Sequence, residues 1–161
     1  RQATMQTSFL FICILLVPVI SSQKVPTGCV EIKHAKIQKY LVVSHSASHD
    51  EDRRHVTYSR TPEQWLLYSD EGHYRILHQR LLEDLFVSAQ TWKGRYVFTW
   101  MPKERIENGL WDVLPAGRGK FILRNAYYKD CLQTVGSFGW VQAYPECRGS
   151  DFEWEIQLAD C

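Results

Sequence analysis

The sequence predicts a single all-β domain built from three similar units of four short strands. Tryptophans recur at a nearly constant interval along the chain. Short segments rich in β-branched and aromatic residues alternate with polar residues, as half-buried strands do. Clusters that contain glycine, proline and aspartate separate these segments and are typical of turns. The chain has 161 residues, a length that favours one domain.

The repeat is most visible at the tryptophans that close each unit. Trp65, Trp111 and Trp154 are 46 and 43 residues apart. In every unit, a leucine lies at one fixed distance along the sequence from the first apolar residue of the unit. A polar residue lies at a second fixed distance from that same apolar residue. The leucines are Leu41, Leu85 and Leu132, and the polar residues are His34, His78 and Asn125. Self-similarity of this kind indicates a repeat architecture.

The expected strands follow in order. They cover residues 30–32, 40–43, 56–58 and 65–68 in the first unit, 74–76, 84–87, 96–100 and 111–114 in the second, and 121–123, 131–134, 140–144 and 154–156 in the third. The inward positions are Ile32, Leu41, Val43, Trp65, Ile76, Leu85, Val87, Trp111, Leu123, Leu132 and Trp154. The alternative is a two-sheet meander in which the regular spacing is accidental.

The first 22 residues have the pattern of a secretory leader. Arg1–Thr4 precede the first methionine, Met5, and read as translated upstream sequence. An apolar run follows over residues 9–20 and ends at Ser21 and Ser22. It is too short to span a hydrocarbon core about 30 Å thick. A short apolar run followed by small residues indicates a signal peptide cleaved near Ser22, which leaves residues 23–161 as the domain. A buried core helix is the alternative.

Cysteine count and charge narrow the class of protein. Cys29, Cys131, Cys147 and Cys161 remain after the leader, and an even number in a secreted chain suggests two disulfides, with three possible pairings. Acidic and basic residues balance over residues 23–161. A general nucleic-acid binder would be more basic. Because no second apolar run approaches twenty residues, we expect no membrane span.

The third unit resembles a repeat of the ricin-B-like lectins. It contains Cys131-Leu132-Gln133, an aromatic residue at Tyr144, a second cysteine at Cys147 and a closing Trp154. With three units of this size, the resemblance covers residues 29–161 and implies a β-trefoil fold. In that fold the first and last strands are neighbours, which implies the pairs Cys29–Cys161 and Cys131–Cys147.

The same resemblance implies a partial sugar site. Gln133 occupies the position of the family's sugar-binding aspartate, Tyr144 that of its aromatic platform, and Asp151 that of a further polar residue, with Trp140 beside them. The chain departs from the family because Gln133 lacks the carboxylate and Phe152 replaces the glutamine of the Gln-x-Trp ending. A neutral amide still hydrogen-bonds to a hydroxyl, but without the strength of a charged acceptor. The alternative is that these are ordinary surface residues.

Two further features are candidates for contact with a ligand. Trp92 and Trp140 are expected near hairpin tips, where a large aromatic side chain can anchor a protein, a glycan or a lipid headgroup, or can pack locally. His45, His49 and His55 lie among carboxylates and could ligate Zn²⁺. Because their spacing fits no closed site, we expect a solvated loop and no metal.

Function is therefore argued from binding. The chain has no nucleophile elbow, zinc-protease motif or phosphate-binding loop, so we expect neither an enzyme nor a cofactor. One hypothesis is a secreted lectin-like module that recognises glycans. The alternative is a secreted effector of salivary, venom or inhibitor type that binds a protease, a receptor or a channel through exposed loops. A weaker third hypothesis is a partner of lipid surfaces.

Overall fold

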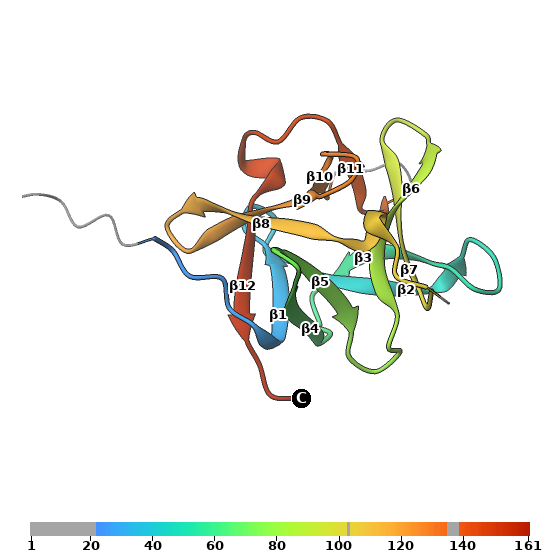
Figure 1. The fold of residues 1–161 in the computed structure, drawn as a ribbon, viewed down its shortest axis with the longest axis horizontal. Helices are drawn as coiled ribbons and strands as arrows, with labels where there is room; N and C mark the ends of the chain where they lie inside the picture. The colour runs from blue at the N-terminus through green and yellow to red at the C-terminus, as the bar shows by residue number, and fades with distance from the viewer. Residues whose placement is uncertain (1–21, 103, 135–138) are drawn as a thin grey trace, which may run out of the picture.

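The computed structural model describes residues 22–102, 104–134 and 139–161, and these form twelve β-strands and two short 3₁₀-helices (Figure 1). The strands are β1 Gly28–His34, β2 Tyr40–Ser48, β3 Arg54–Ser59, β4 Trp65–Asp70, β5 His73–His78, β6 Asp84–Thr91, β7 Arg95–Trp100, β8 Trp111–Gly117, β9 Lys120–Asn125, β10 Cys131–Gln133, β11 Gln142–Tyr144 and β12 Trp154–Leu158. The helices are η1 Glu107–Gly109 and η3 Ser150–Phe152.

Six of these strands form a closed barrel. β1 pairs with β4, β4 with β5, β5 with β8, β8 with β9, β9 with β12, and β12 returns to β1, always antiparallel. Closure leaves the ring without an unpaired edge, and an unpaired edge would be available to pair with another chain. The barrel therefore carries the first and last strands of the domain side by side.

The other six strands form three hairpins, β2–β3, β6–β7 and β10–β11. The hairpins meet one another, because β3 pairs with β7 and β7 pairs with β11. The backbone N–H of Val141, just before β11, donates to the carbonyl of Val56 in β3 at 2.8 Å and completes the contact between the first and third hairpins. The twelve strands thus form one continuous hydrogen-bonded system.

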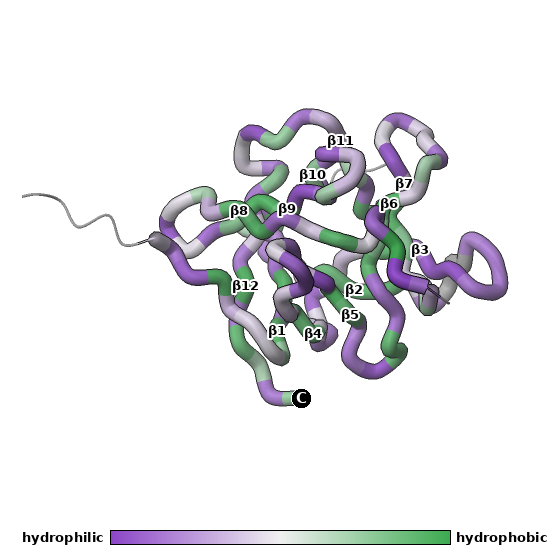
Figure 2. The backbone as a smooth tube through the Cα atoms, in the orientation of Figure 1, coloured by the Kyte–Doolittle hydropathy of each residue, from purple (hydrophilic) through white to green (hydrophobic). Residues whose placement is uncertain are grey.

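The core occupies the inside of the barrel and the underside of the hairpins. Burial alternates along β1 and β9 with the period of two that a pleated strand imposes. All eleven side chains expected to point inward are buried with at most 1% of their surface exposed, which confirms that part of the sequence prediction. Figure 2 shows apolar stretches along the strands and hydrophilic stretches in many turns.

Each closing tryptophan links a barrel strand to a hairpin strand. The indole N–H of Trp65 in β4 donates to the carbonyl of Leu41 in β2 at 2.9 Å. Trp111 makes the same bond to Leu85 at 2.9 Å, and Trp154 to Leu132 at 3.1 Å. All three indole rings are fully buried. A buried indole N–H needs a partner, and here the partner is the same main-chain carbonyl in each unit.

His34, His78 and Asn125 also have equivalent roles, at the turn after the first strand of each unit. The Nδ1 atom of His34 accepts the backbone N–H groups of two turn residues, and the Oδ1 atom of Asn125 does the same. Nδ1 of His78 accepts one such N–H, from Leu81. The turns close in a left-handed residue, which is Gln38, Leu82 or Lys129. Polar side chains at these buried positions therefore support local turn structure.

The expectation of an all-β domain is confirmed. Most observed strands are longer than the expected segments, above all β2 and β6, whereas β10 and β11 in the third unit are shorter. β11 begins at Gln142 rather than Trp140, because Val141 donates to β3 instead of pairing within its own hairpin. The disulfides are Cys29–Cys161 and Cys131–Cys147, as the family resemblance implied. The proposed leader lies almost wholly outside the described residues.

A partly buried carboxylate, Glu63, fixes the loop that precedes β4. It accepts the backbone N–H of Val43 at 2.8 Å, Nε2 of His78 at 3.1 Å and Nε2 of His45 at 2.8 Å. Burial alone would raise the pKa of Glu63, but the hydrogen bonds from His78, Val43 and His45 lower it to about 2. The ionised carboxylate is therefore part of the folded state.

We expect the two disulfides to contribute unequally to stability. Cys29–Cys161 closes 132 residues and Cys131–Cys147 closes 16. The chain-entropy model gives about 5 kcal/mol for the longer loop and about 3 kcal/mol for the shorter one. Replacing each pair by alanine and measuring the free energy of unfolding in urea tests this. A larger loss on removing the Cys131–Cys147 pair would contradict it.

Glu63 predicts acid sensitivity. Its folded-state pKa lies below its ordinary value, so its contribution to stability is present above about pH 4.5 and is lost as the pH falls toward 2. The loss amounts to about 3 kcal/mol at most. Urea unfolding from pH 7 to pH 2 should show this slope in the native chain and a flatter profile in Glu63→Gln. The exposed Glu146→Gln is the matched control, and an unchanged slope in Glu63→Gln would refute the assignment.

Candidate functional site

The residues proposed for a sugar site lie on neighbouring elements of the third unit. β10 and β11 pair so that Gln133 lies opposite Gln142 and Cys131 lies opposite Tyr144. Opposed residues in an antiparallel pair point to the same side of the sheet. Gln133 and Tyr144 thus share one side of this hairpin, while Leu132 and Ala143 face the core.

The Tyr144 ring packs against the tip of the neighbouring hairpin. A Cβ atom placed on Gly94 would come within 2.7 Å of Cζ of Tyr144, so only glycine fits between the β6–β7 turn and this ring. The tyrosine hydroxyl donates to Oε1 of Gln142 at 3.2 Å, and Nε2 of Gln142 donates to the Trp92 carbonyl at 3.0 Å. One ring face of the expected platform is thereby covered, and the Trp92 side chain beside it is half exposed.

The other two residues of the expected site have partners elsewhere. The Asp151 carboxylate, on η3, accepts from Nζ of Lys36 at 2.8 Å. Trp140 stacks on the His55 ring with centroids 3.6 Å apart and contacts the Tyr96 ring edge to face at 6.1 Å. The structure therefore brings Trp92, Gln133 and Tyr144 to one region and gives Asp151 and Trp140 separate structural contacts.

Equivalent positions in the first two units are apolar. The strand register places Val42 and Phe86 where the third unit has Gln133, and both side chains are buried. Neither can accept a hydrogen bond from a sugar hydroxyl. A sugar site built on this pattern is therefore restricted to the third unit.

The histidine segment is partly structural. His55 is buried beneath Trp140, and its ring contacts those of His49, Tyr96 and Phe98. Burial, and secondarily the neighbouring His49, lowers the pKa of His55 to about 4, so this ring is neutral at physiological pH. The expectation of a solvated loop is thus wrong for His55. Among the described residues, no group of histidine, cysteine or carboxylate side chains is arranged to hold a metal ion.

The surface with the most unusual composition lies around the loop that joins β7 to β8, which sequence analysis did not single out. Six large hydrophobic side chains are exposed in the described part of the chain: Tyr68, Leu82, Trp92, Met101, Tyr127 and Leu158. Four of them line two hollows that flank this loop. We name this surface the 101–107 face, defined by Met101, Pro102, Glu104, Arg105 and Glu107 with Tyr68, Leu82 and Tyr127 beside them.

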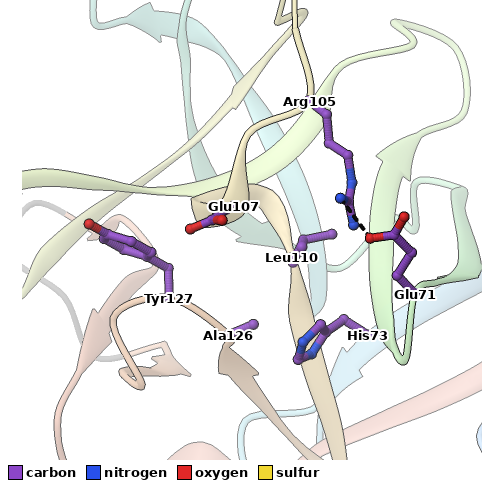
Figure 3. Close-up of a pocket in the computed structure, with 7 residues that line it drawn as sticks. All are labelled: Glu71, His73, Arg105, Glu107, Leu110, Ala126 and Tyr127. Carbon is purple, nitrogen blue, oxygen red and sulfur yellow. Dashed lines mark ion pairs between the residues drawn. The ribbon is translucent and has the colours of Figure 1, made fainter.

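The first hollow, which we name the Tyr127 hollow, has a volume of 380 Å³ (Figure 3). Tyr127 lies on one side, Arg105 and Glu71 lie on the other, and Glu107 and Leu110 stand between them. The guanidinium group of Arg105 pairs with Glu71 at 2.9 Å.

His73 also lines the Tyr127 hollow, and a partly buried network with Asp112 and Arg124 holds it in place. Its Nδ1 lies 2.7 Å from Oδ1 of Asp112, and Arg124 donates to the other carboxylate oxygen at 2.9 Å. Burial alone would raise the pKa of Asp112, but the hydrogen bonds from Arg124 and His73 hold it below its usual range. The polar wall of this hollow is therefore fixed before any ligand arrives.

The second hollow, the Met101 hollow, has a volume of 350 Å³ and shares Arg105 with the first. Its apolar lining includes Tyr68, Leu82 and Met101. Two charged side chains line it as well: the buried Asp84, at the start of β6, forms an ion pair with the partly exposed Arg75 of β5. Burial raises the pKa of the Asp84 carboxyl, and the ion pair with Arg75 opposes that shift.

One feature of the sequence indicated that this surface could be an interaction site. Met101 and Pro102 open a loop of mostly charged residues, where no strand pattern explains a large apolar side chain. Contiguous exposed apolar surface rimmed by charged groups marks an interaction site. Only the fold shows that Tyr68, Leu82 and Tyr127 join it, because they come from three other segments of the chain. In the described part of the chain, no helix is long and apolar enough to cross a membrane.

No protein-family model matches this chain, and no curated protein matches it in sequence. Solved structures do. A designed threefold-symmetric protein, ThreeFoil, superimposes with a TM-score of 0.71 at 18% identity over 81% of this chain and 98% of its own. At that identity the likeness shows the fold alone.

Two salivary proteins from Culex quinquefasciatus, both described as members of the Cysteine and Tryptophan-Rich (CWRC) family, are more similar. One has a TM-score of 0.73 at 24% identity over 84% of this chain and 96% of its own. The other has a TM-score of 0.79 at 35% identity over 87% of this chain and 99% of its own. Because that identity extends over nearly the whole of the relative, this chain belongs to the Cysteine and Tryptophan-Rich (CWRC) family.

Proposed function

We propose that this chain is a secreted, non-enzymatic binding protein with a β-trefoil fold, and that it binds an extracellular protein through the 101–107 face. Two disulfides and two salivary relatives support an extracellular location. Three equivalent tryptophan contacts and the likeness to a threefold-symmetric design support the trefoil assignment.

The observation that carries the proposal is the gathering of exposed apolar side chains. Four of the six large hydrophobic residues exposed in the described structure line the two adjoining hollows of this face. Tyrosine, methionine and arginine are enriched in the cores of protein interfaces, and Tyr68, Tyr127, Met101 and Arg105 supply all three types here.

A protein target is favoured over a glycan because the expected sugar site is incomplete. Gln133 lacks the carboxylate, one face of Tyr144 packs on Gly94, and the Asp151 carboxylate pairs with Lys36. Glycan recognition remains the second candidate, because Gln133 and Tyr144 share one side of the β10–β11 hairpin and Trp92 is exposed beside them.

We expect a charge placed on the 101–107 face to abolish binding to a protein target. Residues 23–161, oxidised and folded, would be applied to an array of secreted proteins and receptor ectodomains, and each hit would be titrated. Met101→Asp should weaken a specific interaction at least tenfold, about 1.4 kcal/mol, because it puts a carboxylate into a desolvated contact.

The matched control for this experiment is Leu158→Asp, which changes an exposed leucine on β12, outside the 101–107 face. Equal losses in Met101→Asp and Leu158→Asp would show that the 101–107 face is not the contact surface.

The glycan alternative makes a separate prediction. If the third unit binds sugar, a glycan array should give signal for a defined sugar class that falls in Gln133→Ala and Tyr144→Ala and persists in Met101→Asp. Gln133→Ala removes no core packing, so it separates loss of a site from loss of folding. We expect a blank array from the folded protein, and such a glycan signal would replace the protein-target proposal.

A further inference from the structure

We propose that the Met101 hollow accepts the side chain of a lysine or arginine from the protein partner, with the cation toward Asp84 and the alkyl stem against Met101 and Leu82. This inference rests on the proposed function, because it names the chemistry of the partner at the 101–107 face. It is carried by an unsatisfied buried carboxylate, by the pairing of charges around the hollow and by its apolar rim.

Asp84 has one carboxylate oxygen without a hydrogen bond. Oδ2 pairs with Arg75, whereas Oδ1 is buried and accepts nothing from the described residues. The side chain as a whole is only 4% exposed. A buried acceptor that is left unpaired costs roughly 1–3 kcal/mol, so a donor that reaches it recovers a substantial free energy. Because Asp84 lines the Met101 hollow, that donor can come from a bound side chain.

The charged groups around the hollow leave carboxylate oxygens for a cation. Two carboxylates, Asp84 and Glu104, and two guanidinium groups, Arg75 and Arg105, line it, and Arg105 also pairs with Asp70 and Glu71 outside the lining. Arg75 is occupied twice, by Asp84 and by the face of Tyr68, whose ring centroid lies 5.7 Å away. Both guanidinium groups of the lining are thus already paired with carboxylates, so an added ammonium or guanidinium group can interact with Glu104 and with Oδ1 of Asp84.

The rim matches the rest of such a side chain. Leu82 and Met101 are each more than half exposed. In the sequence, Leu82 precedes β6 and Met101 follows β7. Lysine and arginine bury their methylene stems along apolar surface while the charged end keeps its polar partner. Methionine has a flexible unbranched side chain, so it can adapt its shape to a bound methylene stem.

The test uses n-butylammonium as a lysine side-chain analogue, with neutral N-butylacetamide as its matched control. Backbone amide signals of the oxidised protein would be followed by NMR during titration at low ionic strength. We expect saturable shifts at Leu77, Leu82 and Asp84, at least fivefold weaker binding in Glu104→Gln and in Met101→Ala, and no change in Leu158→Ala. Asp84 is left intact, because its removal would strand the buried Arg75.

Three outcomes would overturn the inference: no saturable shift, equal shifts with the neutral analogue, or shifts confined to other surfaces. Failure of the proposed function has a different signature. Saturable ammonium binding in the Met101 hollow together with a blank protein array keeps the cation site and removes the protein target. A confirmed protein partner whose affinity is unchanged after acetylation of its lysines and in Glu104→Gln keeps the binding face and removes the cation site.

Discussion

Each closing tryptophan donates its indole N–H to the carbonyl of a leucine in a hairpin strand, and the rest of the architecture depends on that bond being made three times. A buried indole without a partner would cost free energy, whereas one bonded to a main-chain carbonyl fixes both its own ring and the strand it reaches. The bond joins a barrel strand to a hairpin strand in every unit. It therefore holds the three hairpins over one end of the barrel, and the loops between them are positioned as a result.

Once the interior is repeated, the outward positions are free to differ between units. Val42, Phe86 and Gln133 occupy equivalent places in the strand register, yet only the third is polar. A ring-bearing residue precedes an equivalent buried valine in each unit, and these residues are His55, Tyr96 and Trp140. Their rings contact one another. The residues of the 101–107 face come from the second unit and its neighbours, so this surface is not repeated three times in the way the interior is.

The sequence predicted the fold better than the candidate site, for a physical reason. The period of two along the strands and the spacing of Trp65, Trp111 and Trp154 depend on local geometry that repeats, so the strands and the inward positions could be derived. The disulfide pairing needed the added premise that the first and last strands are neighbours. The 101–107 face could not be derived, because Tyr68, Leu82 and Tyr127 are far apart in sequence and come to line the two hollows beside Arg105 only in the folded chain. The contact between Gly94 and the Tyr144 ring could not be derived either, because it depends on how two hairpins pack.

Backbone N–H groups of a turn are accepted by a side chain in every unit, by an imidazole nitrogen of His34 and His78 and by the amide oxygen of Asn125. The three units therefore differ in whether the accepting atom can take up a proton. A histidine whose Nδ1 accepts turn N–H groups gives up that lone pair if it is protonated, and burial lowers the pKa of His34, which favours the neutral ring that the first turn needs. Asn125 holds the third turn with an amide oxygen that takes up no proton in the same range. The third unit, which also carries its own disulfide, thus has a turn that does not depend on a histidine remaining neutral.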